Sequence, residues 1–81
     1  METIHINKYG INQDFDKEEI FDYLYEIHKK HYIDYVDAED LPNKYYQIQE
    51  MIYYNCVDFI KDLIGEENVD DFIEYCEYME L

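Results

Sequence analysis

The chain has 81 residues and carries 21 aspartates and glutamates against six lysines and no arginine, a net charge of −15. Such acidity argues against a protein that binds nucleic acid or an anionic membrane itself, since both would repel it. Hydrophobic residues make up 48% of the chain, with eleven tyrosines and four phenylalanines, which excludes the composition of a disordered protein. We therefore expect residues 1–81 to form a single acidic domain with one small core.

Residues 1–15 have no helical period, and we expect them to form an extended arm packed on the helices. Polar and apolar residues alternate from Thr3 toward Gly10, as in a short strand, but a lone strand has no partner unless residues 32–36 supply one. The opening METIHINKYG lacks the features of a signal peptide, and no apolar run approaches the roughly 20 residues that span a bilayer. We expect a cytoplasmic protein of the host cell.

The first helix is expected from about residue 17 to residue 32. Asp16 followed by Glu19 has the spacing of a capping box, with Asp in place of Ser or Thr. Residues 31–43 fit either a further turn of this helix or an irregular connection. The buried face of the helix would consist of Ile20, Phe21, Leu24, Ile27 and His31.

The second helix, over residues 43–64, is the element around which the fold is expected to form. Asp40 is the expected N-cap, Pro42 suits the first turn, and Gly65 would end the helix. Steps of three and four residues predict one core-facing stripe, which Met51, Ile60 and Ile64 would widen. The stripe itself consists of Tyr45, Ile48, Ile52, Cys56, Phe59 and Leu63.

The third helix is expected over residues 69–80, with Asn68 as its cap. Its apolar side would hold Val69, Phe72, Ile73, Cys76 and Met79 or Leu81. Short connections favour antiparallel neighbours, so the sequence predicts an all-α protein, a small three-helix bundle with an extended N-terminal arm.

Catalytic and metal-binding patterns are weak. His28, His31 and Asp34 have a spacing that one metal ion can share, but no second ligand pair accompanies them, so we expect structural histidines and neither a metal nor a cofactor. Cys56 and Cys76 fall on apolar stripes and are expected to pack in the core. With one side-chain hydroxyl of serine or threonine type and two glycines, the chain offers no activated hydroxyl nucleophile and no phosphate loop, so we do not expect an enzyme.

Carboxylates follow one face of the first and third helices with almost no lysine among them, unlike ordinary exposed faces. Carboxylates four residues apart rise by about 6 Å along a helix, comparable with phosphates along a nucleic-acid strand. Tyrosines beside them could stack on arginine. The predicted partner-binding residues are Glu18, Asp22, Glu26, Asp70, Asp71, Glu74, Glu77, Tyr25, Tyr54, Tyr75 and Tyr78.

With its small size, its acid stripes and the segment EENVDDFIEYCEYMEL, the chain resembles the acidic DNA-mimic inhibitors of phages and mobile elements, which include anti-CRISPR and antirestriction proteins. The resemblance implies an inhibitor that occupies the basic groove of a nucleic-acid-binding protein, such as a CRISPR effector, and evades host defence without chemistry of its own. The alternative is a protein–protein module: an antitoxin or immunity protein on a basic toxin, or a regulator that forms a homodimer.

Overall fold

The computed structural model describes residues 2–80, which form a β-hairpin followed by three α-helices. Met1 of the expected arm and Leu81 of the expected third apolar stripe lie outside the described residues. The elements are β1 (Thr3–Lys8), β2 (Ile11–Asp16), α1 (Lys17–Asp37), the short 3₁₀ helix η1 (Ala38–Asp40), α2 (Asn43–Ile64) and α3 (Glu66–Glu80).

The N-terminal arm is a β-hairpin, so the expectation of an all-α protein was wrong in this part. Strands β1 and β2 pair antiparallel, from Thr3 opposite Asp16 to Lys8 opposite Ile11. Tyr9 and Gly10 have φ values of 55° and 81°, the two positive values that a two-residue type I′ hairpin turn requires. The partner of the first strand is therefore its immediate neighbour in sequence and not residues 32–36.

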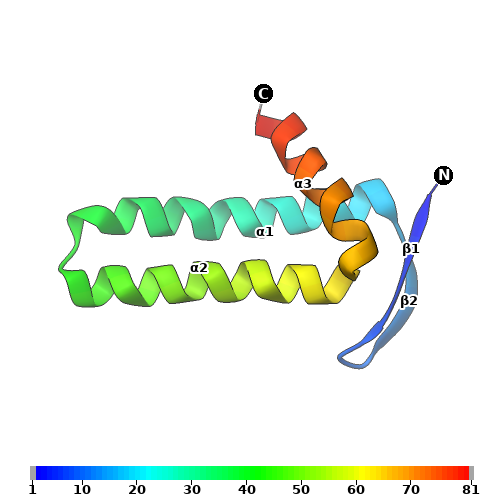
Figure 1. The fold of residues 1–81 in the computed structure, drawn as a ribbon, viewed down its shortest axis with the longest axis horizontal. Coiled ribbons are helices and arrows are strands. Elements are labelled where there is room, and N and C mark those ends of the chain that lie inside the picture. The colour runs from blue at the N-terminus through cyan, green and yellow to red at the C-terminus, as the bar shows by residue number, and fades with distance from the viewer. Residues whose placement is uncertain (1, 81) are drawn as a thin grey trace.

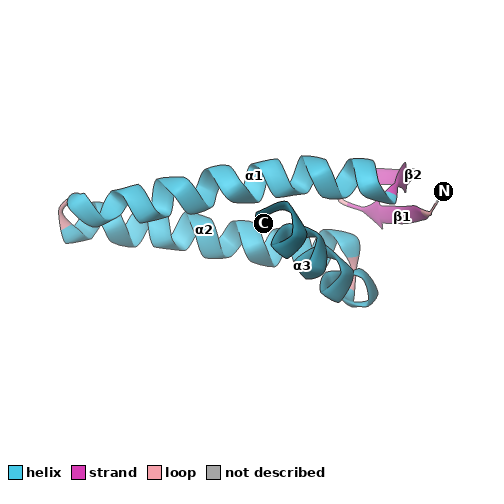
Figure 2. Ribbon diagram, turned by 90° about the horizontal axis from the view of Figure 1, so that it is seen from above, coloured by secondary structure: helices cyan, strands magenta, loops and turns pink. Residues whose placement is uncertain are grey.

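Helices α1 and α2 lie side by side along the long axis of the molecule, whose extents are 45 × 32 × 17 Å (Figure 1). The β-hairpin and α3 both pack at the same end of this helix pair, and the view from above shows the same arrangement (Figure 2). The other end consists of two helices with no third layer. The three helices were predicted correctly, but they do not form a bundle along their whole length.

The helix ends differ from the predicted ones in three places. Asp16 caps α1 as predicted, since its carboxylate accepts a hydrogen bond from the backbone N–H of Glu19 at 3.3 Å. Helix α1 continues to Asp37, so residues 31–43, which the sequence left open, are mostly helical. Helix α2 begins after Pro42 and has no side-chain cap. Helix α3 begins at Glu66, where Asn68 donates a hydrogen bond to the carbonyl of Ile64 at 2.8 Å. Asp40 lies in η1 and is not a cap.

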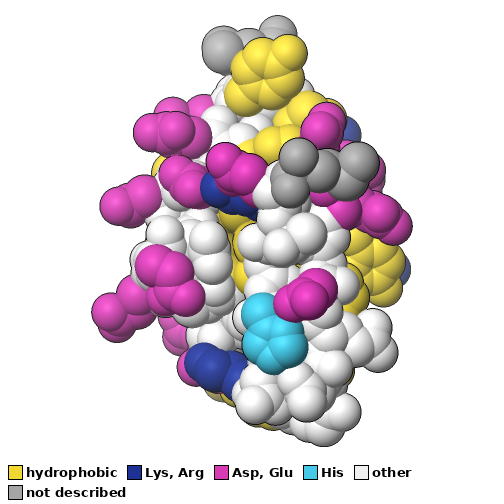
Figure 3. Space-filling model, turned by 90° about the vertical axis from the view of Figure 1, so that its right-hand side faces the viewer, with side chains coloured by type: hydrophobic (Ala, Val, Ile, Leu, Met, Phe, Trp, Pro, Cys, Tyr) yellow, Lys and Arg dark blue, Asp and Glu magenta, His cyan; other side chains and the backbone are white. Residues whose placement is uncertain are grey.

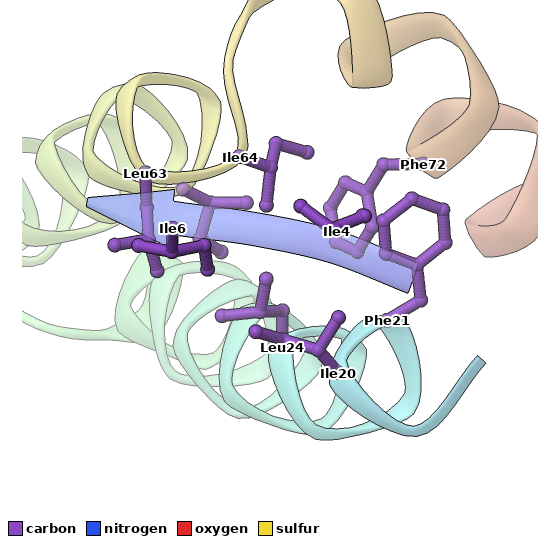
Figure 4. Close-up of a cluster of buried hydrophobic side chains, with 9 residues drawn as sticks. Ile4, Ile6, Ile20, Phe21, Leu24, Leu63, Ile64 and Phe72 are labelled. Atoms are coloured by element: carbon purple, nitrogen blue, oxygen red, sulfur yellow. The ribbon is translucent and has the colours of Figure 1, made fainter. Parts of the chain in front are cut away.

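The core lies at the end where the β-hairpin and the three α-helices meet. Figure 4 shows side chains of β1, α1, α2 and α3 converging there. Phe21 of α1 packs edge-on against Phe72 of α3, with ring centroids 5.3 Å apart. The buried cluster consists of Ile4, Ile6, Ile20, Phe21, Leu24, Ile60, Leu63, Ile64 and Phe72.

The stripe predicted to be the buried face of α2 is mostly exposed. Leu63 is buried and Cys56 half-buried, but Tyr45, Ile48, Met51, Ile52 and Phe59 are exposed. Ile60 and Ile64, which were predicted to widen the stripe, are buried in the core, and Tyr53 also packs against α1. The reason is that a two-helix layer buries only one side of each helix, and β1 covers just the last turn of the stripe.

Candidate acidic partner-binding groove

An acidic groove lies between the first half of α1 and α3. The two helices meet through Phe21, whose ring lies 5.8 Å from that of Tyr75 in addition to its contact with Phe72. Above this contact a hollow of about 780 Å³ remains open to solvent. We call it the acidic groove; its lining residues are Glu2, Asp16, Lys17, Glu18, Phe21, Asp71, Glu74, Tyr75 and Tyr78.

The groove combines five carboxylates with one lysine. That lysine, Lys17, makes ion pairs with Asp71 at 2.7 Å and with Glu2 at 2.9 Å. The hydrogen bond to Asp71, followed by that to Glu2, raises the pKa of the Lys17 ammonium. Its positive charge is therefore already neutralised within the protein, and the groove presents a net negative surface.

Tyr75 links the two walls of the groove. Its hydroxyl donates a hydrogen bond to the carboxylate of Asp22 at 3.3 Å, and its ring packs edge-on against the buried Tyr25. Burial, and next the negative charge of Asp22, raise the pKa of Tyr75, which keeps the hydroxyl protonated as a donor at neutral pH. Tyr78, one turn further along α3, is exposed at the rim.

Six of the eleven predicted partner-binding residues come together here: Glu18, Asp71, Glu74, Tyr75 and Tyr78 line the groove, and Asp22 bonds to Tyr75. Tyr25 is buried and supports the packing of α1 on α3. The other four lie on separate surfaces. Glu26 of α1 lines a hollow beside β2, and Glu77 of α3 lines one that faces the helix pair. Asp70 lies near Lys8 and Asp62, and Tyr54 lies on the far half of α2.

Three charged residues of the groove, Glu2, Asp16 and Lys17, were not among the predicted partner-binding residues. The hairpin places them, because the backbone N–H of Lys17 donates a hydrogen bond to the carbonyl of Glu2 at 3.0 Å. The sequence signal that could have found them is the pair Tyr9–Gly10 between two short β-rich runs, which fits a hairpin turn.

The acidic character extends beyond the groove onto other parts of the hairpin end of the molecule. Figure 3 shows acidic side chains along both edges of this end, with basic side chains at only a few places. On β1, Lys8 donates hydrogen bonds to the carbonyl and the carboxylate of Asp62 at 2.6 and 3.1 Å, while the Tyr9 hydroxyl donates to the same carboxylate. These bonds lower the pKa of Asp62, the one from Tyr9 most of all.

Tyrosines also fill the seam between α1 and α2 in the far half of the helix pair. The rings of Tyr35 and Tyr53 stack at 5.3 Å, and the Tyr46 hydroxyl donates to that of Tyr35 at 3.0 Å. This hydrogen bond is the main cause that raises the pKa of Tyr35 to about 12. Together with Tyr32 and Tyr54 these rings hold two helices together where the chain has no aliphatic core.

The histidines of α1 are not gathered into a metal site. Within residues 2–80 no group of three His, Cys, Asp or Glu side chains is arranged to hold a metal ion. The ring of His28 lies 5.5 Å from that of Tyr53, and burial, more than any nearby charge, lowers its pKa. No helix among these residues has both the length and the apolar character to cross a membrane.

Cys76 is expected to react slowly with thiol reagents. Burial, and next the charges of Glu80 and Glu77, raise its pKa to about 11, from an ordinary value of 9.0. At pH 8 the reactive thiolate is then about 100-fold rarer than in an unfolded chain. Alkylation rates of a Cys56→Ser variant, measured folded and in denaturant, test this. Equal rates in the two states would contradict it.

Comparisons of the chain with protein-family models, curated proteins and solved structures found no match.

Proposed function

We propose that this protein is an acidic DNA mimic that binds the basic DNA-binding groove of a nucleic-acid-binding protein and blocks access of DNA. The observation that supports this most directly is the acidic groove, where five carboxylates surround one lysine that two of them already neutralise. Such a surface attracts the arginines and lysines that otherwise contact phosphates. A CRISPR effector is the target that we favour, since its nucleic-acid channel is positively charged.

The mechanism is competition, without covalent chemistry. A net charge of −15 accelerates association with a basic groove, and salt screens this attraction beyond about 10 Å at 0.1 M. At contact, the carboxylates of Glu18 and Glu74 pair with basic side chains of the target. The exposed ring of Tyr78 stacks on a guanidinium and adds specificity that charge alone does not give.

Capture from a host lysate on the immobilised protein tests the proposal. The bound protein is identified and then challenged with excess duplex DNA and, separately, with raised salt. We expect a DNA-binding protein that both treatments release, because DNA and the inhibitor occupy the same groove. A partner that salt releases but excess DNA does not would contradict DNA mimicry.

A second candidate function is a protein–protein module that covers a basic toxin or assembles with itself. The exposed apolar residues of α2 favour it, since a mimic that acts through charge has no use for them. The DNA challenge separates the two functions, because only the complex of a mimic is released by duplex.

A further inference from the structure

An exposed apolar stripe on α2 has no role in the proposed function. It consists of Tyr45, Ile48, Ile52, Cys56 and Phe59, and we call it the α2 stripe. Four of its five side chains are exposed, and at one end of the stripe the ring of Tyr9 from the β-hairpin lies 5.5 Å from that of Phe59. We propose that a second copy of this chain covers the α2 stripe, so that the protein is a twofold-symmetric dimer.

The exposed area of the chain has the size that such a dimer needs. A compact monomer of 10.1 kDa exposes about 5,300 Å². This chain exposes 6128 Å², because the far half of the helix pair has no third layer. The excess of roughly 800 Å² equals the area that each partner contributes to a stable interface of standard size.

The charge distribution selects a second copy as the occupant. Residues 41–57 carry one acid, Glu50, and one base, Lys44, in a chain that otherwise has 20 acids. A partner with a charge of −15 is repelled by the groove, by the β-hairpin and by α3, but not by this neutral stretch. An equally acidic molecule can therefore approach this stretch, whereas a basic partner would gain little electrostatic attraction from it.

The positions of the stripe residues are self-complementary. They are symmetric about Ile52: Tyr45 and Phe59 lie seven residues on either side of it, and Ile48 and Cys56 lie four. In an antiparallel pair of α2 helices with the twofold axis at Ile52, the tyrosine of one copy lies level with the phenylalanine of the other. Each Ile48 then lies level with a Cys56, and each Ile52 meets its own counterpart.

The antiparallel direction also keeps the acidic ends apart. Helix α3 and the β-hairpin, which supply part of the lining of the acidic groove, lie beside the C-terminal end of α2 (Figure 1). A parallel pair would bring two such ends together, whereas the antiparallel pair places them at opposite ends of the dimer. It also brings Lys44 of each copy close to Asp58 of the other, which adds an ion pair at each edge of the interface.

The molar mass in solution, measured by light scattering or sedimentation over a range of concentrations, tests the dimer. We expect the wild type to have twice the mass of one chain, and Ile52→Glu, which sets two carboxylates against each other at the axis, to dissociate at least 100-fold more readily. The control is Ile73→Glu on α3, which makes the same substitution outside the α2 stripe at a side chain of similar exposure, 43% for Ile73 and 40% for Ile52. It should remain a dimer. A monomeric wild type, or equal effects of both variants, would overturn the proposal.

An engineered disulfide between two copies tests the position of the twofold axis independently. Ile52→Cys in a Cys56→Ser, Cys76→Ser background is expected to form covalent dimers under mild oxidation, and Ile73→Cys in the same background is not. Circular dichroism confirms that each variant is folded. Dimers that form without cross-linking at residue 52 would place the interface elsewhere and contradict the proposal.

Salt distinguishes this proposal from the proposed function. Screening weakens the attraction of an acidic groove for a basic target but reduces the repulsion between two acidic copies. Raised salt should therefore strengthen the dimer while it releases the target. The two proposals can then fail separately, since loss of one response leaves the other measurable.

Discussion

Replacing Phe21 with alanine is expected to remove a large part of the stability of the protein. The side chain is 3% exposed, and its ring joins α1 to both Phe72 and Tyr75 of α3. Truncation of a buried phenylalanine costs about 3–5 kcal/mol, whereas a domain of this length has a free energy of unfolding of about 4–12 kcal/mol. Urea denaturation followed by circular dichroism measures the change.

The matched control is Tyr23→Ala, since Tyr23 lies two residues away on the same helix but is 68% exposed. It should change the free energy of unfolding by less than about 1 kcal/mol. If Phe21→Ala were equally mild, α3 would not be held on α1 by this aromatic contact, and the acidic groove would not be a fixed surface.

Removing two charges from the acidic groove is expected to abolish tight binding of the target. The double variant Glu18→Gln, Glu74→Gln keeps the shape of both side chains and leaves Lys17 with its two partners. Each lost charge pair at a desolvated interface costs about 2 kcal/mol or more, so the affinity should fall by about 1,000-fold. Titration of the purified target measures the dissociation constant.

The control removes the same net charge at the opposite end of the molecule. Asp37→Asn with Glu39→Gln changes exposed residues at the tip of the helix pair, and it should alter the affinity by less than about threefold. If both double variants weakened binding equally, net charge and not the groove would govern recognition. Thermal unfolding of each variant checks that its structure is intact.

Much of the helical structure follows from local sequence patterns. The first and last residues of α2 and the Asp16 cap of α1 depend on residues close to the helix ends, and they were predicted correctly, although Asp40 does not cap α2. The buried residues Ile20, Phe21 and Leu24 of α1 also follow from the apolar period. These features depend on interactions within three or four residues, which a sequence displays directly.

The β-hairpin and the orientation of α2 could not be derived in this way. The hairpin turn uses Tyr9 at a positive φ in place of the more common Asn or Asp, so its signal is weak. Apolar residues occupy more than half of the circumference of α2, so the period alone does not tell which of them are buried. Whether Ile52 or Tyr53 faces the core depends on which helix lies beside α2. That information is absent from the pattern of one helix.

The acidic groove was anticipated only as two separate rows of carboxylates. Helix period places one row on the first helix and another on the third, and only the contact of Phe21 with α3 brings Glu18 of one row together with Glu74 of the other. The predicted rows are Glu18, Asp22 and Glu26, and Asp70, Glu74 and Glu77. Glu2 and Lys17 join them through the hairpin. Sequence therefore predicted the chemical character of the site, and tertiary packing determined its shape.

The core lies at one end of the molecule, and this determines where a label or a surface can be attached. The tip of the helix pair around η1 lies at the opposite end of the long axis from α3 and the β-hairpin, which supply part of the lining of the acidic groove (Figure 1). Glu39 is exposed there, so a fluorophore, a biotin or a chip surface coupled at this position leaves the groove open to its target. A tag fused next to Glu2 would instead sit on the lining of the groove.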